Sequence, residues 1–267
     1  VPFRITRDSD LDVDEEDMEN LLKEIEISLR KRKRGASVRL EILKTRNQSI
    51  KKFLAENLDL TEQAIYEING PLDVTCFFKF IKLLNEPKWE FEPFVPQKPL
   101  ELPKLDNLFD RIREHDILFH HPYESFEAVI KLVSDAANDP NVLAIKQTLY
   151  RVSGNSPIVG ALAKAAENGK QVTVLVELKA RFDEENNIIW ARRLEKAGCH
   201  VIYGLMGLKT HAKIILIVRK EPDGIKRYVH LGTGNYNDNT AKLYTDIGIM
   251  TANDQFGSDA SAFFNLL

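Results

Sequence analysis

The chain has 267 residues, enough for one large domain or two smaller ones, and its 43% hydrophobic content can build ordinary cores. Its formal net charge of −3 argues against a general nucleic-acid-binding protein, which would carry a basic excess. No apolar run approaches the roughly 20 residues that cross a bilayer, no secretory signal is visible, and two distant cysteines predict a reducing compartment. Because the chain lacks an initiating Met and stops inside the apolar run 263–267, we expect a piece of a longer protein.

The first 92 residues predict a small α+β unit. In chain order, the predicted elements are a solvated acidic helix start at 14–19, a helix over 21–34, a strand over 38–42, a helix over 50–57, a strand over 64–68 and a helix over 74–84. The helices show apolar residues at the 3.6-residue period, and the strands are short apolar or alternating runs. In the last helix we expect the large apolar side chains to pack inward, namely Phe77, Phe78, Phe80 and Ile81.

Five prolines between Pro87 and Pro103 predict an extended linker, because such density forbids a helix and weakens a central strand. We place the domain boundary here, with one unit over 1–92 and a second over 93–267. Beyond the linker, strands alternate with helices, which predicts an α/β domain with a mostly parallel or mixed sheet flanked by helices. The predicted elements are helices over 105–114, 125–138, 157–168 and 186–197, strands over 116–119, 142–149, 172–178, 200–203, 214–218 and 226–231, and a hairpin turn at 223–224.

The motif His211-Ala212-Lys213 opens an apolar strand. Strand alternation would aim His211 and Lys213 at the same face. An imidazole is a nucleophile or proton carrier near neutral pH, and an ammonium attracts phosphate oxygens. The pair therefore favours attack on phosphorus, with the group held on nitrogen. The alternative is a half-buried histidine at a strand start beside a solvated lysine.

Cationic residues stand at three predicted strand ends: Arg151 at one, Lys179 and Arg181 at the next, and His211 with Lys213 at a third. In an α/β sheet such ends meet at one edge, where guanidinium forks would match phosphate oxygens. The alternative is that the two arginines form surface salt bridges with the acidic residues 183–185.

A second polar stretch follows the predicted hairpin. The loop Gly232-Thr233-Gly234-Asn235 lets backbone N–H groups approach an anion, and Asn235 could hydrogen-bond a transferred group, although a plain tight turn is the alternative. Tyr244 and Asp246 lie two residues apart, so in an extended segment they share a face. We expect Asp246 either to accept a hydrogen bond from His211 and fix its tautomer, or to cap a turn.

Seven blocks together resemble the type-1 polyphosphate kinases of bacteria: FRITRD (3–8), HPYESF (121–126), AIKQTLYR (144–151), VELKARFDEE (176–185), GLKTHAK (207–213), HLGTGNYN (230–237) and LYTD (243–246). The resemblance implies reversible transfer of the ATP γ-phosphoryl group to inorganic polyphosphate, with Mg²⁺. It implies part of a head domain over 1–92 and the first of two phospholipase D-like catalytic domains over 93–267. It further implies a cytoplasmic homo-oligomer, a dimer or tetramer, that can associate with the inner membrane and has no nucleic-acid partner.

The same resemblance assigns roles to individual residues. The phosphorylated histidine falls on His211, the nucleotide-contacting tyrosine on Tyr244, and the arginines of the Mg²⁺–phosphate site on Arg151 and Arg181. Because a guanidinium has no lone pair for a metal, we read both arginines as contacts to metal-bound phosphate. The expected catalytic set is His211 and Lys213, with Asp246 orienting the imidazole; Asn235 would contact the transferred group.

Two departures qualify the resemblance. The phospholipase D signature has an Asp five residues after the Lys, where this chain has Val218, and a hairpin is inserted before the Gly-Asn loop. Other domains of the family carry a nucleotide-contacting Asn, a further Arg and a second catalytic His, so we expect this chain to hold an incomplete site. The alternatives are a phospholipase D-type phosphodiesterase or nuclease, and a non-catalytic polyanion-binding module.

Overall fold

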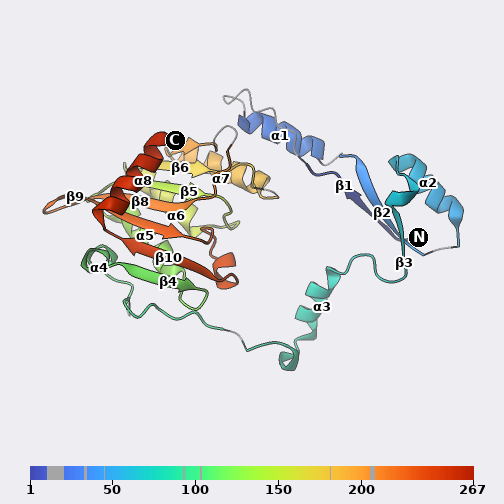
Figure 1. The fold of residues 1–267 in the computed structure, drawn as a ribbon, viewed down its shortest axis with the longest axis horizontal. Coiled ribbons are helices and arrows are strands. Elements are labelled where there is room, and N and C mark those ends of the chain that lie inside the picture. Colours follow the sequence, from blue (N-terminus) through green and yellow to red (C-terminus); the bar gives the residue numbers. More distant parts are fainter. Residues whose placement is uncertain are drawn as a thin grey trace. The chain divides into compact units, whose positions relative to one another are not determined.

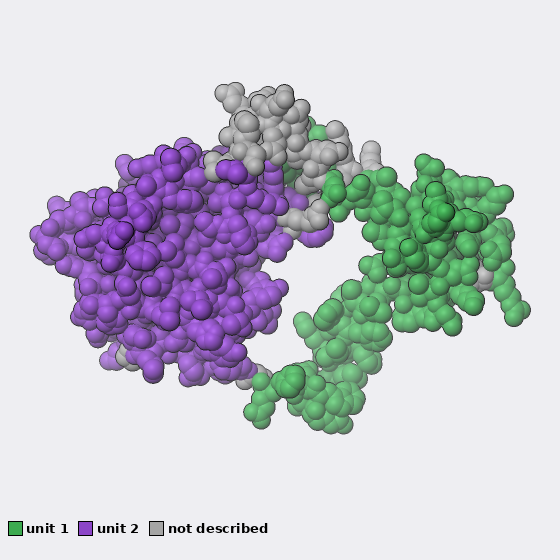
Figure 2. All heavy atoms as spheres, in the orientation of Figure 1, with its two compact units in different colours: residues 1–14, 23–93 green, residues 15–22, 94–267 purple. Residues whose placement is uncertain are grey.

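The computed structural model describes residues 1–10, 21–32, 35–44, 46–92, 94–102, 104–180, 182–204 and 208–267. The chain divides into two compact units (Figure 2). The first comprises residues 1–14 and 23–93, and the second comprises 94–267 together with 15–22. No helix in the described ranges is both long and apolar enough to cross a membrane.

The first unit contains a three-stranded sheet in the order β1–β2–β3 (Figure 1). Its elements are β1 (Phe3–Arg7), α1 (Leu21–Arg32), β2 (Ser37–Leu43), α2 (Gln48–Leu58), β3 (Ile65–Ile68) and α3 (Cys76–Leu84). Strand β2 is the centre, antiparallel to β1 and parallel to β3, and its Leu40 and Ile42 are fully buried. The predicted α+β class is confirmed for this unit, but β1 was not predicted, and the predicted helix start at 14–19 lies outside the described residues.

The inward packing predicted for α3 is wrong. No residue of this helix is buried, and Phe78 is 74% exposed. Helical periodicity correctly predicted an amphipathic helix, but it does not identify the surface that the apolar face will contact. The proline-rich segment that follows contains a 3₁₀ turn (Pro87–Trp89) and an isolated parallel bridge between Gln97 and Glu124.

The second unit is a seven-stranded sheet in the order β4–β10–β9–β8–β5–β6–β7, flanked by helices (Figure 1). Its strands are β4 (Ile117–His121), β5 (Val142–Leu149), β6 (Gln171–Val176), β7 (His200–Ile202), β8 (Lys213–Glu221), β9 (Gly224–Gly232) and β10 (Asp246–Thr251). Its α-helices are α4 (Leu108–Glu114), α5 (Glu127–Asn138), α6 (Pro157–Glu167), α7 (Glu184–Lys196) and α8 (Asp254–Leu266). The α/β class is confirmed.

The sheet is mixed rather than mostly parallel. Among the described strands, β5, β6 and β7 are parallel neighbours, and the other neighbouring pairs are antiparallel. Parallel strands need a crossover connection of a dozen or more residues, usually a helix. Helices α6 and α7 supply it for β5–β6–β7, whereas a tight turn joins β8 to β9. Strand β10 and helix α8 were not predicted.

Both faces of this sheet are covered. Helix α8 packs on one face, where Phe264 and Ala260 join Ile214, Leu216 and Val229 in an apolar cluster. The alternate residues of β8, Ile215 and Ile217, face the other side and are fully buried as well. The sheet is therefore a rigid core, and its chemistry is confined to strand ends and loops.

Candidate active site

Six strand ends of the second unit meet at one edge of the sheet. Because β8 is antiparallel to β5, the start of β8 lies beside the end of β5. The register then pairs Lys213 at the start of β8 with Gly232 at the end of β9, and Asp246 at the start of β10 with His121 at the end of β4. The end of β6 joins them through its parallel pairing with β5. The predicted polar segments are therefore neighbours.

The ring of Tyr150, just after β5, lies at the centre of the cationic groups. The His211 ring packs edge-on against it with centroids 5.1 Å apart. Lys213 Nζ lies 5.5 Å from the same ring centre, and the Arg151 guanidinium carbon lies 5.8 Å from it. A π face attracts cations, so Tyr150 offsets part of the repulsion between these like charges. Sequence reasoning did not single out Tyr150, although it directly precedes a predicted site arginine.

His211 and Lys213 are neighbours, but not through the strand alternation that the sequence predicted. Strand β8 begins only at Lys213, so regular alternation does not extend to His211. The imidazole is exposed, whereas Lys213 is 5% exposed and its Nζ donates a 2.6 Å hydrogen bond to the His211 carbonyl oxygen. The exposed ring can therefore reach a ligand, and the lysine holds the backbone behind it.

Local charge favours the neutral imidazole. Partial burial lowers the pKa of His211 below its ordinary value, and the positive charges of Lys213, Arg151 and Lys209 lower it further. Burial also lowers the pKa of Lys213, an effect that the Asp246 carboxylate opposes. A neutral imidazole has a free lone pair, so these shifts favour a nucleophilic His211 near neutral pH.

The two predicted arginines have different outcomes. Arg151 Nε forms a 2.7 Å ion pair with Asp183 Oδ2, the salt-bridge alternative raised by the sequence, while its guanidinium remains near Tyr150. Arg181 lies outside the described residues. Lys179 follows β6, and its backbone N–H donates a 3.0 Å hydrogen bond to Glu177 Oε1.

The glycine loop approaches the start of β10 closely. A Cβ added to Gly234 would lie 2.5 Å from Asp246 Oδ2, so only glycine fits beside this carboxylate. Asp246 Oδ1 accepts a 2.8 Å hydrogen bond from Thr233 Oγ1, which ties the loop to β10. The Asn235 side-chain oxygen is buried, with no partner among the described residues, and Tyr244 is 64% exposed.

The donor set does not form a metal site. In the described ranges, no group of three or more His, Cys, Asp or Glu side chains could hold a metal ion. The groups gathered around Tyr150 are an imidazole, an ammonium and a guanidinium, none of which suits Mg²⁺, a hard cation that prefers oxygen ligands. Three such groups around one ring have the chemistry of a phosphate contact rather than of a metal ligand set.

Two family models match this chain. Residues 107–267 match the family described as "Polyphosphate kinase C-terminal domain 1", and residues 1–80 match "Polyphosphate kinase middle domain". The chain belongs to the polyphosphate kinase family.

Individual members of the polyphosphate kinase family match along the whole chain. It is 58% identical to a polyphosphate kinase of Halalkalibacterium halodurans over 100% of its length, and 57% identical to one of Bacillus anthracis over 99%. The crystal structure of polyphosphate kinase from Porphyromonas gingivalis superposes with a TM-score of 0.74 at 29% identity, covering 99% of this chain and 37% of that one. The chain spans about 38% of the length of the two curated relatives.

Proposed function

We propose that this chain forms part of a polyphosphate kinase that reversibly transfers the γ-phosphoryl group of ATP to inorganic polyphosphate through a phosphohistidine on His211. The single observation that carries the proposal is an exposed imidazole with a lowered pKa among cationic groups at one sheet edge. Such a site presents a lone pair to phosphorus and positive charge to phosphate oxygens.

The proposed reaction has two displacements. The neutral imidazole nitrogen of His211 attacks the γ-phosphorus, a P–N bond forms, and the bond to the β-phosphate oxygen breaks to release ADP. A terminal oxygen of polyphosphate then attacks the same phosphorus and breaks the P–N bond. Lys213, Arg151 and Arg181 would neutralise charge on the transferring group, which is the main catalytic task in phosphoryl transfer. Tyr244 would contact the nucleotide, and Asn235 the transferred group.

We propose that Asp246 orients the imidazole of His211 during the reaction. It raises the pKa of Lys213 and bonds Thr233, and its second oxygen is the one next to Gly234. Mg²⁺ would be held by the phosphate oxygens of the nucleotide, with Arg151 and Arg181 as phosphate contacts. The described side chains do not offer the metal a ligand set of their own.

We propose the domain assignment on the same grounds: residues 1–92 as part of a head domain and 93–267 as a phospholipase D-like catalytic domain. The H-x-K segment and the Gly-Asn loop at one edge of a mixed sheet support the second assignment. The homo-oligomeric state, the cytoplasmic location and the further active-site residues expected from other domains stay predictions.

The test uses the full-length enzyme that contains this sequence, incubated with γ-³²P-ATP. We expect wild type to gain acid-labile label and His211→Ala to gain none, whereas the control His200→Ala, an exposed histidine at the start of β7, labels normally. Undiminished labelling of His211→Ala would place the covalent intermediate on another residue. ATP-independent cleavage of a model phosphodiester would instead support the phosphodiesterase alternative.

A further inference from the structure

Regular sheet pairing stops just short of the proposed nucleophile. The ladder between β5 and β8 ends at the pair Gln147–Ile215, and the ladder between β8 and β9 ends at Lys213–Gly232, so residues 210–212 around His211 lie outside both ladders. A segment without ladder bonds is free to shift, whereas a nucleophile for in-line attack must be held near one position. The structure must therefore hold this segment in another way.

The side chain of Thr148 bonds the backbone of β8 and the residue before it, just beyond the end of the β5–β8 ladder. This residue is 2% exposed, and its Oγ1 donates a 2.7 Å hydrogen bond to the carbonyl oxygen of Ala212. The same oxygen accepts a 3.1 Å hydrogen bond from the backbone N–H of Ile214. One hydroxyl thus uses both its donor and an acceptor lone pair to hold the chain immediately after His211.

The carboxylate of Glu177 holds the chain immediately before His211. Glu177 is 2% exposed, and its Oε2 accepts a 2.8 Å hydrogen bond from the backbone N–H of Thr210. Its Oε1 accepts from the Lys179 N–H at 3.0 Å. No ion pair joins this carboxylate to a cation within the described ranges, so backbone N–H groups are what compensate its burial there.

Glu177 is itself fixed on both sides. Its backbone N–H donates to the carbonyl oxygen of Leu149 at 2.9 Å, and its own carbonyl accepts from Asn187 Nδ2 at 2.9 Å. The same amide group of Asn187 donates to the carbonyl of Tyr150 at 2.7 Å. The carboxylate therefore projects from a rigid strand end rather than from a mobile loop.

We propose that Thr148 and Glu177 are positioning residues that clamp the backbone on either side of His211 and so fix the imidazole for in-line attack. The inference rests on the proposed function, because it assigns the purpose of the clamp to phosphohistidine formation. The side chain of Thr148 on β5 and that of Glu177, the residue after β6, hold three backbone atoms at positions 210, 212 and 214, which restrains the backbone of His211 between them.

The first test compares Thr148→Val with Thr148→Ser in the full-length enzyme. Valine keeps the shape and removes the hydroxyl, whereas serine keeps the hydroxyl and removes the methyl group. We expect Thr148→Val to slow phosphoenzyme formation at saturating ATP by about 10- to 100-fold, the effect of a misplacement of about 1 Å, with KM for ATP unchanged. Thr148→Ser should stay within about threefold of wild type. Equal losses in both variants, or normal labelling of Thr148→Val, would overturn the clamp.

The second test uses Glu177→Gln, which keeps the shape but turns one oxygen into an NH₂ donor facing a backbone N–H. We expect a loss of the same kind as for Thr148→Val, again in the labelling rate rather than in KM. If the glutamine variant labels at the wild-type rate, the carboxylate has no positioning role. This variant also decides the question if Thr148→Val fails to fold.

A third measurement separates failure of the clamp from failure of the proposed function. Hydrogen–deuterium exchange of the peptide 208–216 needs no activity and reports on the N–H groups of Thr210 and Ile214. We expect Thr148→Val and Glu177→Gln to speed its exchange at least tenfold, while a peptide covering β10 keeps the wild-type rate. If the two variants exchange faster but the wild type gains no label, the clamp stands and the phosphohistidine is rejected. If the variants exchange at the wild-type rate, the clamp is rejected whatever the activity.

Discussion

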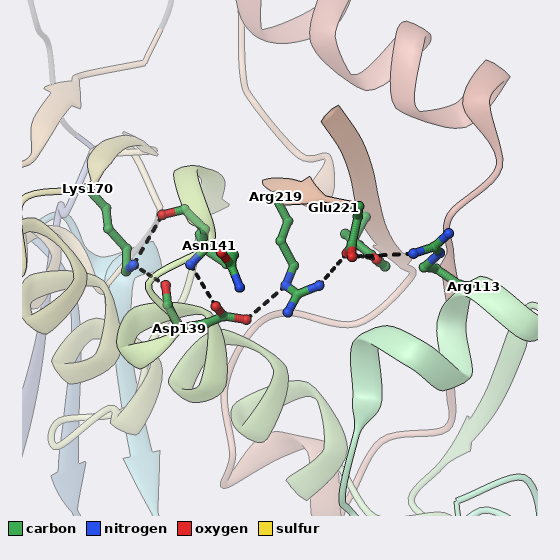
Figure 3. Close-up of polar contacts among 8 residues, drawn as sticks. Arg113, Asp139, Asn141, Lys170, Arg219 and Glu221 are labelled. Carbon is green, nitrogen blue, oxygen red and sulfur yellow. Dashed lines mark hydrogen bonds and ion pairs between the residues drawn. The ribbon is translucent and has the colours of Figure 1, made fainter. Parts of the chain in front are cut away.

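Charged side chains are arranged differently at the two ends of strand β8. Opposite charges pair with one another near the β8–β9 turn, whereas positive charges gather near His211, at the start of the strand. At the hairpin end, Arg219 Nε forms a 2.8 Å bond with Asp139 Oδ2, and its Nη1 pairs with Glu221 Oε1 (Figure 3). Glu221 is 6% exposed and also accepts from Tyr228 Oη at 2.5 Å and from Arg113 Nη1 at 3.3 Å. At the other end, His211 and Lys213 face further positive charge around one aromatic ring.

The difference shows what separates a structural charge from one available to a ligand. Burial by itself would lower the pKa of Arg219, but the carboxylates of Glu221 and Asp139 outweigh it and raise this pKa well above its usual range, so the guanidinium stays charged and paired. Burial and then the like charges of Lys213, Arg151 and Lys209 instead lower the pKa of His211, and a bound anion would offset those charges. The residue type alone does not distinguish a structural cation from one that could bind a ligand; the partners of each cation do.

Removing the shared carboxylate of the paired end should have the largest effect. We expect Glu221→Ala to lower the free energy of unfolding by about 3 kcal/mol, because it removes the carboxylate that Tyr228 and Arg113 share with Arg219 and leaves Arg219 with Asp139 alone. Urea denaturation measures the change. The control is Glu114→Ala, which removes an exposed pair with Arg111 and should cost less than about 0.5 kcal/mol. Equal losses in the two variants would show that the Glu221 network adds no special stability.

Acid should destabilise the second unit through His230. This histidine is 2% exposed, its Nδ1 lies 2.9 Å from Tyr236 Oη, and burial, with the nearby His121, lowers its pKa to about 3. The unfolded chain binds a proton near pH 6.5 and the folded one does not, so stability is full above 6.5 and falls by up to about 1.4 kcal/mol per pH unit below it.

Urea midpoints between pH 7.5 and 5 test the role of His230. We expect wild type to lose stability over this range and His230→Gln to show a flatter dependence, because it removes the titrating group. The same slope in both proteins would contradict the assignment.

At the end that carries His211, charge removal should change the pH profile of the reaction. Lys209 is exposed and is one of the cations that lower the pKa of His211. We expect Lys209→Met to move the acid limb of phosphoenzyme formation to higher pH, since the imidazole then gains its proton more readily. Rapid-quench labelling across pH 5 to 8 measures this shift. The control Lys196→Met changes an exposed lysine of α7 and should leave the limb in place; identical profiles for all three proteins would remove Lys209 from the site.

The smallest expected effect concerns Arg151. Its ion pair with Asp183 is partly exposed, with side chains 43% and 34% accessible, so removing the acid should change the binding free energy by at most about 1 kcal/mol. We expect Asp183→Asn to tighten polyphosphate binding up to about fivefold, because one competitor for the guanidinium is lost. Isothermal titration with polyphosphate measures the change, and weaker binding would show that Asp183 orients Arg151 rather than competing with the ligand.

Strongly periodic segments allowed much of the second unit to be predicted. Strand β5 was predicted with its observed bounds, and α6 and α7 within two residues, because buried strands and amphipathic helices carry local signals. Strand β10 was not predicted, since Gly248 interrupts its short apolar run. The prediction that Phe78 packs inward was wrong, because helical periodicity identifies the apolar face of a helix but not the surface that this face contacts.

The sequence by itself determined the α/β class, the order of most elements and the candidate residues His211, Lys213, Arg151, Asn235 and Asp246, since these depend on local pattern and side-chain chemistry. Only the tertiary structure decided that strand ends far apart in the sequence meet around Tyr150, and that Thr148 and Glu177 bracket His211. The reason is physical: strand order and antiparallel register place side chains side by side, and neither is encoded in the spacing of residues along the chain.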